Sequence, residues 1–178
     1  LHDALPICNP PTGGALHDYV IWATELPGIS RAWAFDCWHG LGTVGLAWVY
    51  DQRTDIIPTG TDRESMQAYL FRHQDPATGT YVGKPGGIEV WPIPLTIKPV
   101  PLTIRVIPDT AAIRSAVTLS LQALFRSVSP GDTLLLSAIR TAIGSSTGVT
   151  DYELDLTTNQ ASENYELLTL GAVTWRIV

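Results

Sequence analysis

Turn-forming residues divide this chain into short segments, and they constrain its fold more than any other feature of the sequence. The 178 residues include 15 glycines and 13 prolines. Many of them gather in four clusters: Asn9-Pro10-Pro11-Thr12-Gly13-Gly14, Pro27-Gly28, Asp75-Pro76 and Pro130-Gly131. Because proline and glycine disfavour the interior of helices and strands, each cluster predicts the end of an element. The sequence therefore predicts a series of short helices and strands.

A β-hairpin is predicted near the start of the chain. Residues 29–38 and 44–50 are rich in aromatic and alternating apolar side chains, which is typical of strands. Glycines at residues 40–45 predict the turn between two antiparallel strands. We expect Trp33 and Trp48 to contribute to one apolar cluster in this hairpin.

Helices are predicted on either side of the hairpin. Residues 15–26 carry apolar side chains at helical spacing. Thr61 and Glu64 have the spacing of a capping box, which predicts the start of a second helix at Thr61. The apolar stripe of that second helix consists of Met66, Tyr69, Leu70 and His73.

The second half of the chain predicts strands around two further helices. Residues 88–93 and 102–107 resemble strands, and prolines at 92, 94, 99 and 101 restrict much of the intervening stretch to an edge strand or an extended loop. Asp109-Thr110 predicts the cap of a long helix with an apolar stripe from Ile113 to Val128. A second helix follows Pro130-Gly131 and ends at Gly144. Closing strands are expected at 149–156 and 172–178.

This order of elements indicates an α+β fold. Helices and strands are mixed along the chain without an internal repeat. We expect a largely antiparallel or mixed sheet with helices packed on one face, preceded by an N-terminal helix.

Charge and hydropathy exclude several classes of protein. The formal net charge is −6, and the 11 Lys and Arg residues form no cluster that could follow a phosphate backbone, so no nucleic-acid partner is expected. No apolar run is long enough to cross a bilayer, so no membrane insertion is expected. Cys8 and Cys37 do not make a disulfide framework.

The opening residues have the features of a sequencing artefact. Residues 1–7 can be back-translated into the end of a common short-read sequencing adapter, and they lack a start methionine. We therefore expect this segment to be extended and exposed, and we give His2 and Cys8 no functional weight. The same interpretation predicts that the gene continues upstream.

Two glycine motifs have some features of phosphate-binding loops. Residues 40–45 fit the pattern G-x-G-x-x-G, but the residues after them predict a strand, whereas dinucleotide binding requires a helix there. Residues 79–84 resemble a phosphate loop that is one residue too short, with Pro85 in place of the metal-binding Ser or Thr. We interpret the first as a hairpin turn and the second as a surface loop, and we expect no cofactor.

Two groups of polar residues are candidates for catalytic or metal sites. Asp36, Cys37 and His39 form no set at metal-ligand spacing, and we expect a buried cysteine beside turn residues. Carboxylates of residues 151, 153 and 155 share one strand face, which is more typical of a solvated or charge-protected edge than of acid–base catalysis. We therefore predict no catalytic residue, no metal site and no small-molecule substrate.

The aromatic residues are the remaining candidates for function. The chain has six Trp and six Tyr. Most should lie in the core because they bury a large apolar area, but Trp and Tyr are also enriched at protein interfaces. We name Trp22, Trp38 and Trp91 as candidate interface residues.

An ordered set of segments along the chain carries a family resemblance. Those segments are Asn9-Pro10-Pro11-Thr12-Gly13-Gly14, Pro27-Gly28-Ile29-Ser30-Arg31-Ala32-Trp33, Pro108-Asp109-Thr110-Ala111-Ala112, Pro130-Gly131-Asp132-Thr133-Leu134, Thr150-Asp151-Tyr152 and Leu170-Gly171-Ala172-Val173-Thr174-Trp175. In their order and spacing they resemble the baseplate J-like family, which includes the baseplate wedge protein of Mu-like contractile-tailed phages. The resemblance covers nearly all of the chain after residue 7, although each segment by itself is ordinary.

The resemblance implies a structural subunit of a phage tail baseplate or a related injection machine. It implies partners among baseplate wedge and hub proteins and further copies of the chain, in a virion tail assembled in the bacterial cytoplasm, and it implies no catalytic residues. Within this expectation, residues 8–28 end an upstream helical region and residues 29–178 form the C-terminal domain. The alternative function is a phage-associated hydrolase or carbohydrate-binding module, which would require a concave site with convergent polar groups.

Overall fold

The computed structural model describes residues 14–74, 77 and 79–176, which form two compact units. The first unit ends at Pro94 and the second begins at Leu95. The sequence prediction placed a boundary near Gly28 instead. The structure differs because the helix before Gly28 shares a hydrophobic core with the strands after it. The expected artefact at residues 1–7 lies outside the described residues.

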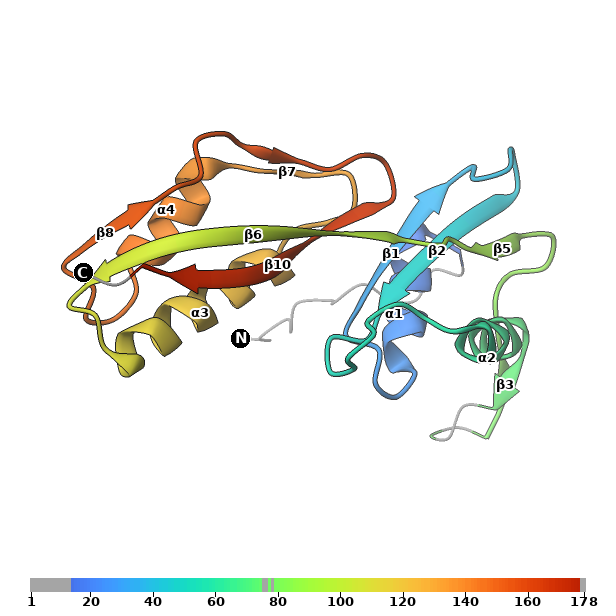
Figure 1. The fold of residues 1–178 in the computed structure, drawn as a ribbon. Coiled ribbons are helices and arrows are strands. Elements are labelled where there is room, and N and C mark those ends of the chain that lie inside the picture. The colour runs from blue at the N-terminus through green and yellow to red at the C-terminus, as the bar shows by residue number, and fades with distance from the viewer. Residues whose placement is uncertain (1–13, 75–76, 78, 177–178) are drawn as a thin grey trace, which may run out of the picture. The chain divides into compact units, whose positions relative to one another are not determined.

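The sheet of the first unit has the strand order β1-β2-β5. Strands β1 (Arg31–Asp36) and β2 (Thr43–Val49) form an antiparallel hairpin, while β5 (Glu89–Pro92) pairs with β2 in parallel (Figure 1). The turn joins β1 to β2 between Asp36 and Thr43. The hairpin prediction is therefore confirmed, and the residues after Gly42 form a strand and not a helix.

Helices α1 (Leu16–Glu25) and α2 (Gly60–Phe71) bury their apolar stripes against one face of this sheet. Trp48 is at the centre of the core and is 1% exposed. The expectation that Trp33 shares this cluster is wrong. Because side chains alternate along a strand, Ala32 and Ala34 face the core and Trp33 points to the opposite face, where Arg31 lies 5.3 Å from its ring.

The cap of α2 lies two residues earlier than the sequence suggested. The helix begins at Gly60, and its capping box joins Thr59 to Asp62, not Thr61 to Glu64. The Asp62 backbone N–H donates to Thr59 Oγ1 at 3.3 Å, and the Thr59 backbone N–H donates to the Asp62 carboxylate at 2.8 Å. Arg53 also donates to this carboxylate, and these contacts together lower the pKa of Asp62 well below its ordinary value.

Two threonine substitutions distinguish the observed cap from the predicted one. We expect Thr59→Ala to lower the free energy of unfolding by about 1 kcal/mol, because the Asp62 backbone N–H at the start of α2 loses its acceptor. Thr61→Ala should change it by less than about 0.5 kcal/mol, as at ordinary surface sites. Urea unfolding followed by circular dichroism measures both. An equal loss in the two variants would contradict the observed cap.

A small hairpin follows α2. Strands β3 (His73–Gln74) and β4 (Tyr81–Val82) pair antiparallel. Residues 79–84, which the sequence assigned to a surface loop, therefore include strand β4. Gly83 lies against the end of α2, where an added Cβ would come within 2.5 Å of the Phe71 carbonyl oxygen. This close approach fixes the hairpin beside the end of α2.

The sheet of the second unit has the order β10-β6-β8. Strand β6 (Thr96–Ile107) is central; β10 (Glu166–Trp175) pairs with it in parallel and β8 (Asp151–Leu154) pairs with it antiparallel. Short strands β7 (Thr133–Leu134) and β9 (Gln160–Ala161) form a separate pair. The two three-stranded sheets are thus mixed, which is one of the two kinds of sheet that the sequence predicted.

Strand β6 contains two prolines, Pro99 and Pro101. It tolerates them because, among the described residues, this part of β6 pairs with β10 on one side and with no strand on the other. Pro99 lies opposite Thr169 of β10, whereas β8 pairs with β6 only from Ile104 onward. A proline cannot donate to a second neighbouring strand, so this half of β6 behaves as an edge. The prediction of an edge strand is confirmed, although the strand begins at Thr96 and not at Leu102. The register with β10 shifts opposite Pro101, between Leu170 and Val173.

Helices α3 (Ala111–Arg126) and α4 (Leu136–Gly144) cover one face of this second sheet (Figure 1). The Ile113 backbone N–H donates to Thr110 Oγ1, which confirms the predicted cap of α3. The core joins the inward residues of β6 to the stripes of both helices: Val100, Leu102, Ile104, Val106, Val117, Leu121, Ile139 and Ile143. Each unit therefore packs helices on one face of a small mixed sheet, which is an α+β arrangement.

Candidate functional site

The candidate catalytic cluster consists of Asp36, Cys37 and His39, which lie at the turn between β1 and β2. Cys37 is exposed, not buried as expected, and its backbone has a left-handed φ of 52°. A hydrogen bond with Asp36 raises the pKa of the Cys37 thiol, which keeps the thiol protonated and lowers its nucleophilicity. His39 contacts the rings of two tryptophans, Trp38 and Trp91.

Carboxylates on β8 are exposed and form ion pairs. Glu153 lies 2.8 Å from Arg105, and Asp155, just after the strand, lies 2.9 Å from Arg176. Because β8 is an edge strand in its sheet, these charges lie where the sequence analysis expected charge protection. Across residues 14–74, 77 and 79–176, no three His, Cys, Asp or Glu side chains are grouped as metal ligands.

The three tryptophans named as interface candidates occupy two different places. Trp22 is on α1, half-buried, with its ring 5.1 Å from that of Tyr19 in the core. Trp38 and Trp91 both contact His39, whose ring centre is 5.8 Å from that of the first and 4.8 Å from that of the second. The structure thus joins Trp38 and Trp91 in one aromatic row, and it places Trp22 with the core helices. Their role at an interface stays a prediction.

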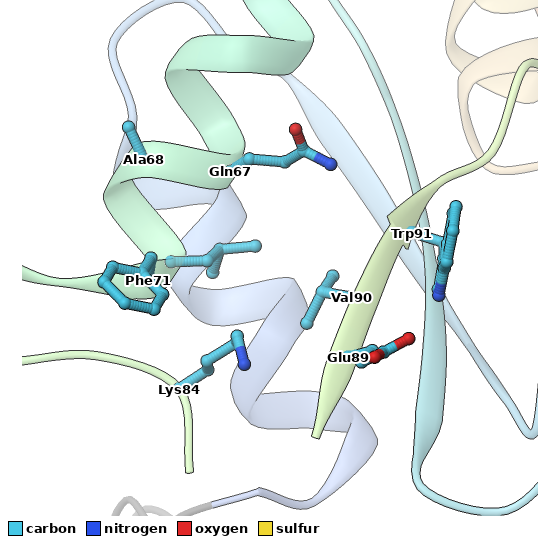
Figure 2. A pocket seen from close by; sticks show the side chains of 8 residues that line it. Gln67, Ala68, Phe71, Lys84, Glu89, Val90 and Trp91 are labelled. Atoms are coloured by element: carbon cyan, nitrogen blue, oxygen red, sulfur yellow. The ribbon is translucent and has the colours of Figure 1, made fainter. Parts of the chain in front are cut away.

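Next to this row, α2 and β5 form the walls of a pocket of about 550 Å³ (Figure 2). Leu70, which is 2% exposed, and half-buried Val90 supply its apolar inner wall. Phe71 stands at its border and is 73% exposed; Trp91, which is 43% exposed, also lines the pocket, but Figure 2 shows its ring on the side of β5 away from Val90.

Two charged residues, Lys84 and Glu89, line the pocket. Lys84 lines it, and the Lys84 ammonium donates a hydrogen bond to the Ile88 carbonyl oxygen. Arg72, directly after Phe71, holds its guanidinium 4.1 Å from the centre of the Tyr81 ring. Glu89 also lines the pocket, but Figure 2 shows its side chain on the side of β5 away from Val90. The pocket is therefore apolar at its inner wall, and one cation, Lys84, and one carboxylate, Glu89, are among the residues that line it.

The outer edge of β5 is poorly suited to accept another strand. The Glu89 N–H donates to Gly42, just before β2, and the Ile93 N–H donates to Leu46 of β2, so Val90 presents its backbone outward. On one side of Val90 the Ile88 carbonyl is already bonded by Lys84, and on the other side Pro92 has no N–H. A partner at this site would therefore bind through side chains.

Among the residues that line the pocket, the sequence prediction named Trp91 but not Phe71 or Lys84. Phe71 follows Leu70 directly, so it cannot share the buried stripe of α2, and a large apolar residue outside the stripe was the available signal. The position of Lys84 depends on the β3–β4 hairpin, which no pattern in the sequence predicted.

Two family models match this chain in succession. The baseplate J-like central domain matches residues 11–107, and the baseplate J-like protein C-terminal domain matches residues 100–176. Their junction falls close to the division between the two compact units after Pro94.

Curated relatives match the same stretch. Baseplate protein gp47 of Escherichia phage Mu is 42% identical over 168 residues, covering 93% of this chain and 47% of that protein. Mu-like prophage FluMu protein gp47 of Haemophilus influenzae is 38% identical over 169 residues, with the same coverage. The chain thus spans about half the length of these relatives. Within its described residues, no helix is both long and apolar enough to span a bilayer.

Proposed function

Because this chain belongs to the family of baseplate J-like proteins, we propose that it is part of a structural subunit of a phage tail baseplate and acts through protein–protein assembly. The observation that carries the proposal is the successive match of the central and C-terminal family domains, which together cover residues 11–176. The relative from phage Mu is itself named a baseplate protein.

The proposed partners are neighbouring wedge and hub proteins of the baseplate, together with further copies of the chain. The proposed location is the virion tail, after assembly in the bacterial cytoplasm. Exposed aromatic side chains around β5 support a role in contact, since Trp, Tyr and Phe are enriched at the centres of protein interfaces. The chain acts in this proposal as a scaffold and not as a catalyst.

Co-expression tests the proposal directly. The full-length protein would be expressed with the tail proteins encoded beside its gene, with an affinity tag on this protein alone. We expect at least one tail protein to co-purify at a fixed ratio. The same tag on an unrelated protein of similar charge is the control. A full-length protein that stays monomeric with every neighbour, and that instead cleaves or binds a bacterial cell-wall glycan, would replace this proposal with the hydrolase or carbohydrate-binding alternative.

A further inference from the structure

We propose that the outer face of α1 binds the region of the full-length protein that precedes this chain. The outer face is the side of α1 opposite the core residues Tyr19 and Ala23, and it consists of half-buried Val20 and five exposed residues: Leu16, His17, Ile21, Thr24 and Glu25. The inference goes beyond the proposed function, because it concerns packing inside one subunit and does not depend on assembly with other proteins.

The outer face of α1 carries large apolar side chains. Leu16 and Ile21 are 38% and 45% exposed, and Val20 lies between them around the helix. The helix contains no Lys, Arg, Asn or Gln. A surface helix normally carries charged and polar residues on its outer side, whereas a helix that is apolar on all sides is normally buried. The composition of α1 is therefore that of a helix covered on both sides.

The polar groups of the outer face already have partners within the chain. The Thr24 hydroxyl donates back to its own helix, 2.8 Å from a carbonyl oxygen one turn earlier. His17 Nε2 lies 3.1 Å from Asp18 Oδ1, and the Tyr69 hydroxyl donates to the Glu25 carboxylate at 2.5 Å. Burying a polar group costs little when its hydrogen bond is kept, so a covering surface could exclude water from this face at a small cost.

Helix α2, which packs on the same core, has a different outer face. Its exposed residues include Arg63, Glu64, Ser65 and Gln67. Both helices bury an inner stripe in one cluster, so that burial does not account for the apolar outer face of α1. A second contact, made by α1 and absent from this part of α2, does account for it.

The family models and the length of the relatives identify the occupant. The chain spans 47% of the Mu relative, and the model that matches from residue 11 is that of a central domain, followed by a C-terminal domain up to residue 176. The remaining half of such a protein therefore precedes the central domain. Because α1 is the first helix of this domain, the preceding region is tethered to its N-terminal end. Tethering gives a high effective concentration, which favours this region over a second copy or another protein.

Cysteine accessibility in the full-length protein tests this inference. Ile21→Cys would be reacted with a maleimide beside Ser65→Cys, the matched exposed position on α2, and peptide mass spectrometry would read the labelling at each site. We expect Ile21→Cys to react at least about tenfold more slowly, because the reagent reaches it only when the interface opens. In the 178-residue chain the two cysteines should react at similar rates. Equal rates in the full-length protein would overturn the inference.

Dilution and co-expression identify the covering surface. Protection of Ile21→Cys that is unchanged on dilution, in full-length protein that sediments as a monomer, supports the preceding region of the same chain. Protection that disappears as an oligomer dissociates would assign the face to a second copy. Protection that appears only with a co-expressed tail protein would assign it to that protein. Either of these last two results would overturn the inference.

A charged substitution gives an independent measurement. Ile21→Lys should lower the midpoint of thermal unfolding of the full-length protein by about 5 °C, because it places a charge in an apolar interface. In the 178-residue chain the same change should shift the midpoint by less than about 1 °C, as at an exposed site. Ser65→Lys is the control and should have little effect in either protein. Circular dichroism checks that each variant is folded. An equal shift by Ile21→Lys in both proteins would show that Ile21 acts within the first unit alone, and would overturn the inference.

Discussion

Replacing Trp48 by alanine should lower the free energy of unfolding by about 3–5 kcal/mol, the largest effect expected of a single side chain in the first unit. Trp48 is 1% exposed and packs among the apolar residues of both helices and of β2: Tyr19, Leu46, Met66 and Leu70. Its removal takes away a large apolar area and leaves a cavity that the surrounding backbone can close only in part. Because a whole domain is stable by only about 5–15 kcal/mol, this unit would be close to unfolding.

Trp33→Ala is the matched control for Trp48→Ala. Trp33 is also a tryptophan of the hairpin and lies one residue from the partner of Trp48, but it is half-buried on the opposite face. We expect it to lose about 1 kcal/mol, chiefly the contact of Arg31 with its ring. Urea unfolding gives the two free energies, and hydrogen exchange shows whether the loss is confined to residues 14–94. Equal losses in the two variants would contradict the observed core.

Replacing Gly171 by alanine should lower the free energy of unfolding by about 1–3 kcal/mol, although the change adds a single methyl group. Gly171 lies where the register between β10 and β6 shifts. A Cβ at this position would lie 2.8 Å from the Val100 carbonyl carbon and 2.9 Å from the Pro101 nitrogen. These are backbone atoms of the central strand, so they cannot move aside as a flexible side chain could, and the two strands must separate locally.

Gly60→Ala provides the comparison for Gly171→Ala. Gly60 is the first residue of α2, and no atom lies within 4 Å of the position that its Cβ would take. Alanine is also the better helix former, so we expect no loss and a small gain in stability. Thermal unfolding of both variants measures these two changes in stability. A Gly171→Ala protein as stable as the original would show that β6 and β10 do not approach so closely.

Elements with strong local signals could be predicted from the sequence. The start of α3 follows from Thr110, which accepts a hydrogen bond from a residue three positions later, and its buried face follows from Ile113, Val117 and Leu121 at helical spacing. The hairpin of β1 and β2 follows from alternation on both sides of a glycine-rich turn. Each of these features depends on residues a few positions apart, so the sequence contains both partners of the interaction in one window.

Where two local signals compete, only the folded structure decided between them. Thr59 and Thr61 are both acceptable caps for α2, and both have an acidic residue three positions later. The contact of Asp62 with Arg53, nine residues earlier, favours Thr59 because it places the carboxylate at the start of the helix. The choice therefore depends on a loop whose conformation no local pattern specifies.

The sequence by itself determined the fold class, the caps and turns of the most regular elements and the resemblance to the baseplate J-like family. Tertiary structure alone decided the division after Pro94, the passage of β6 through its prolines and the pocket that α2 and β5 line together. Each of these depends on residues that are distant in the chain and meet only when helices pack on sheets. Local propensities act over a few residues, whereas the burial of apolar surface selects among distant partners, so no short window of sequence contains the answer.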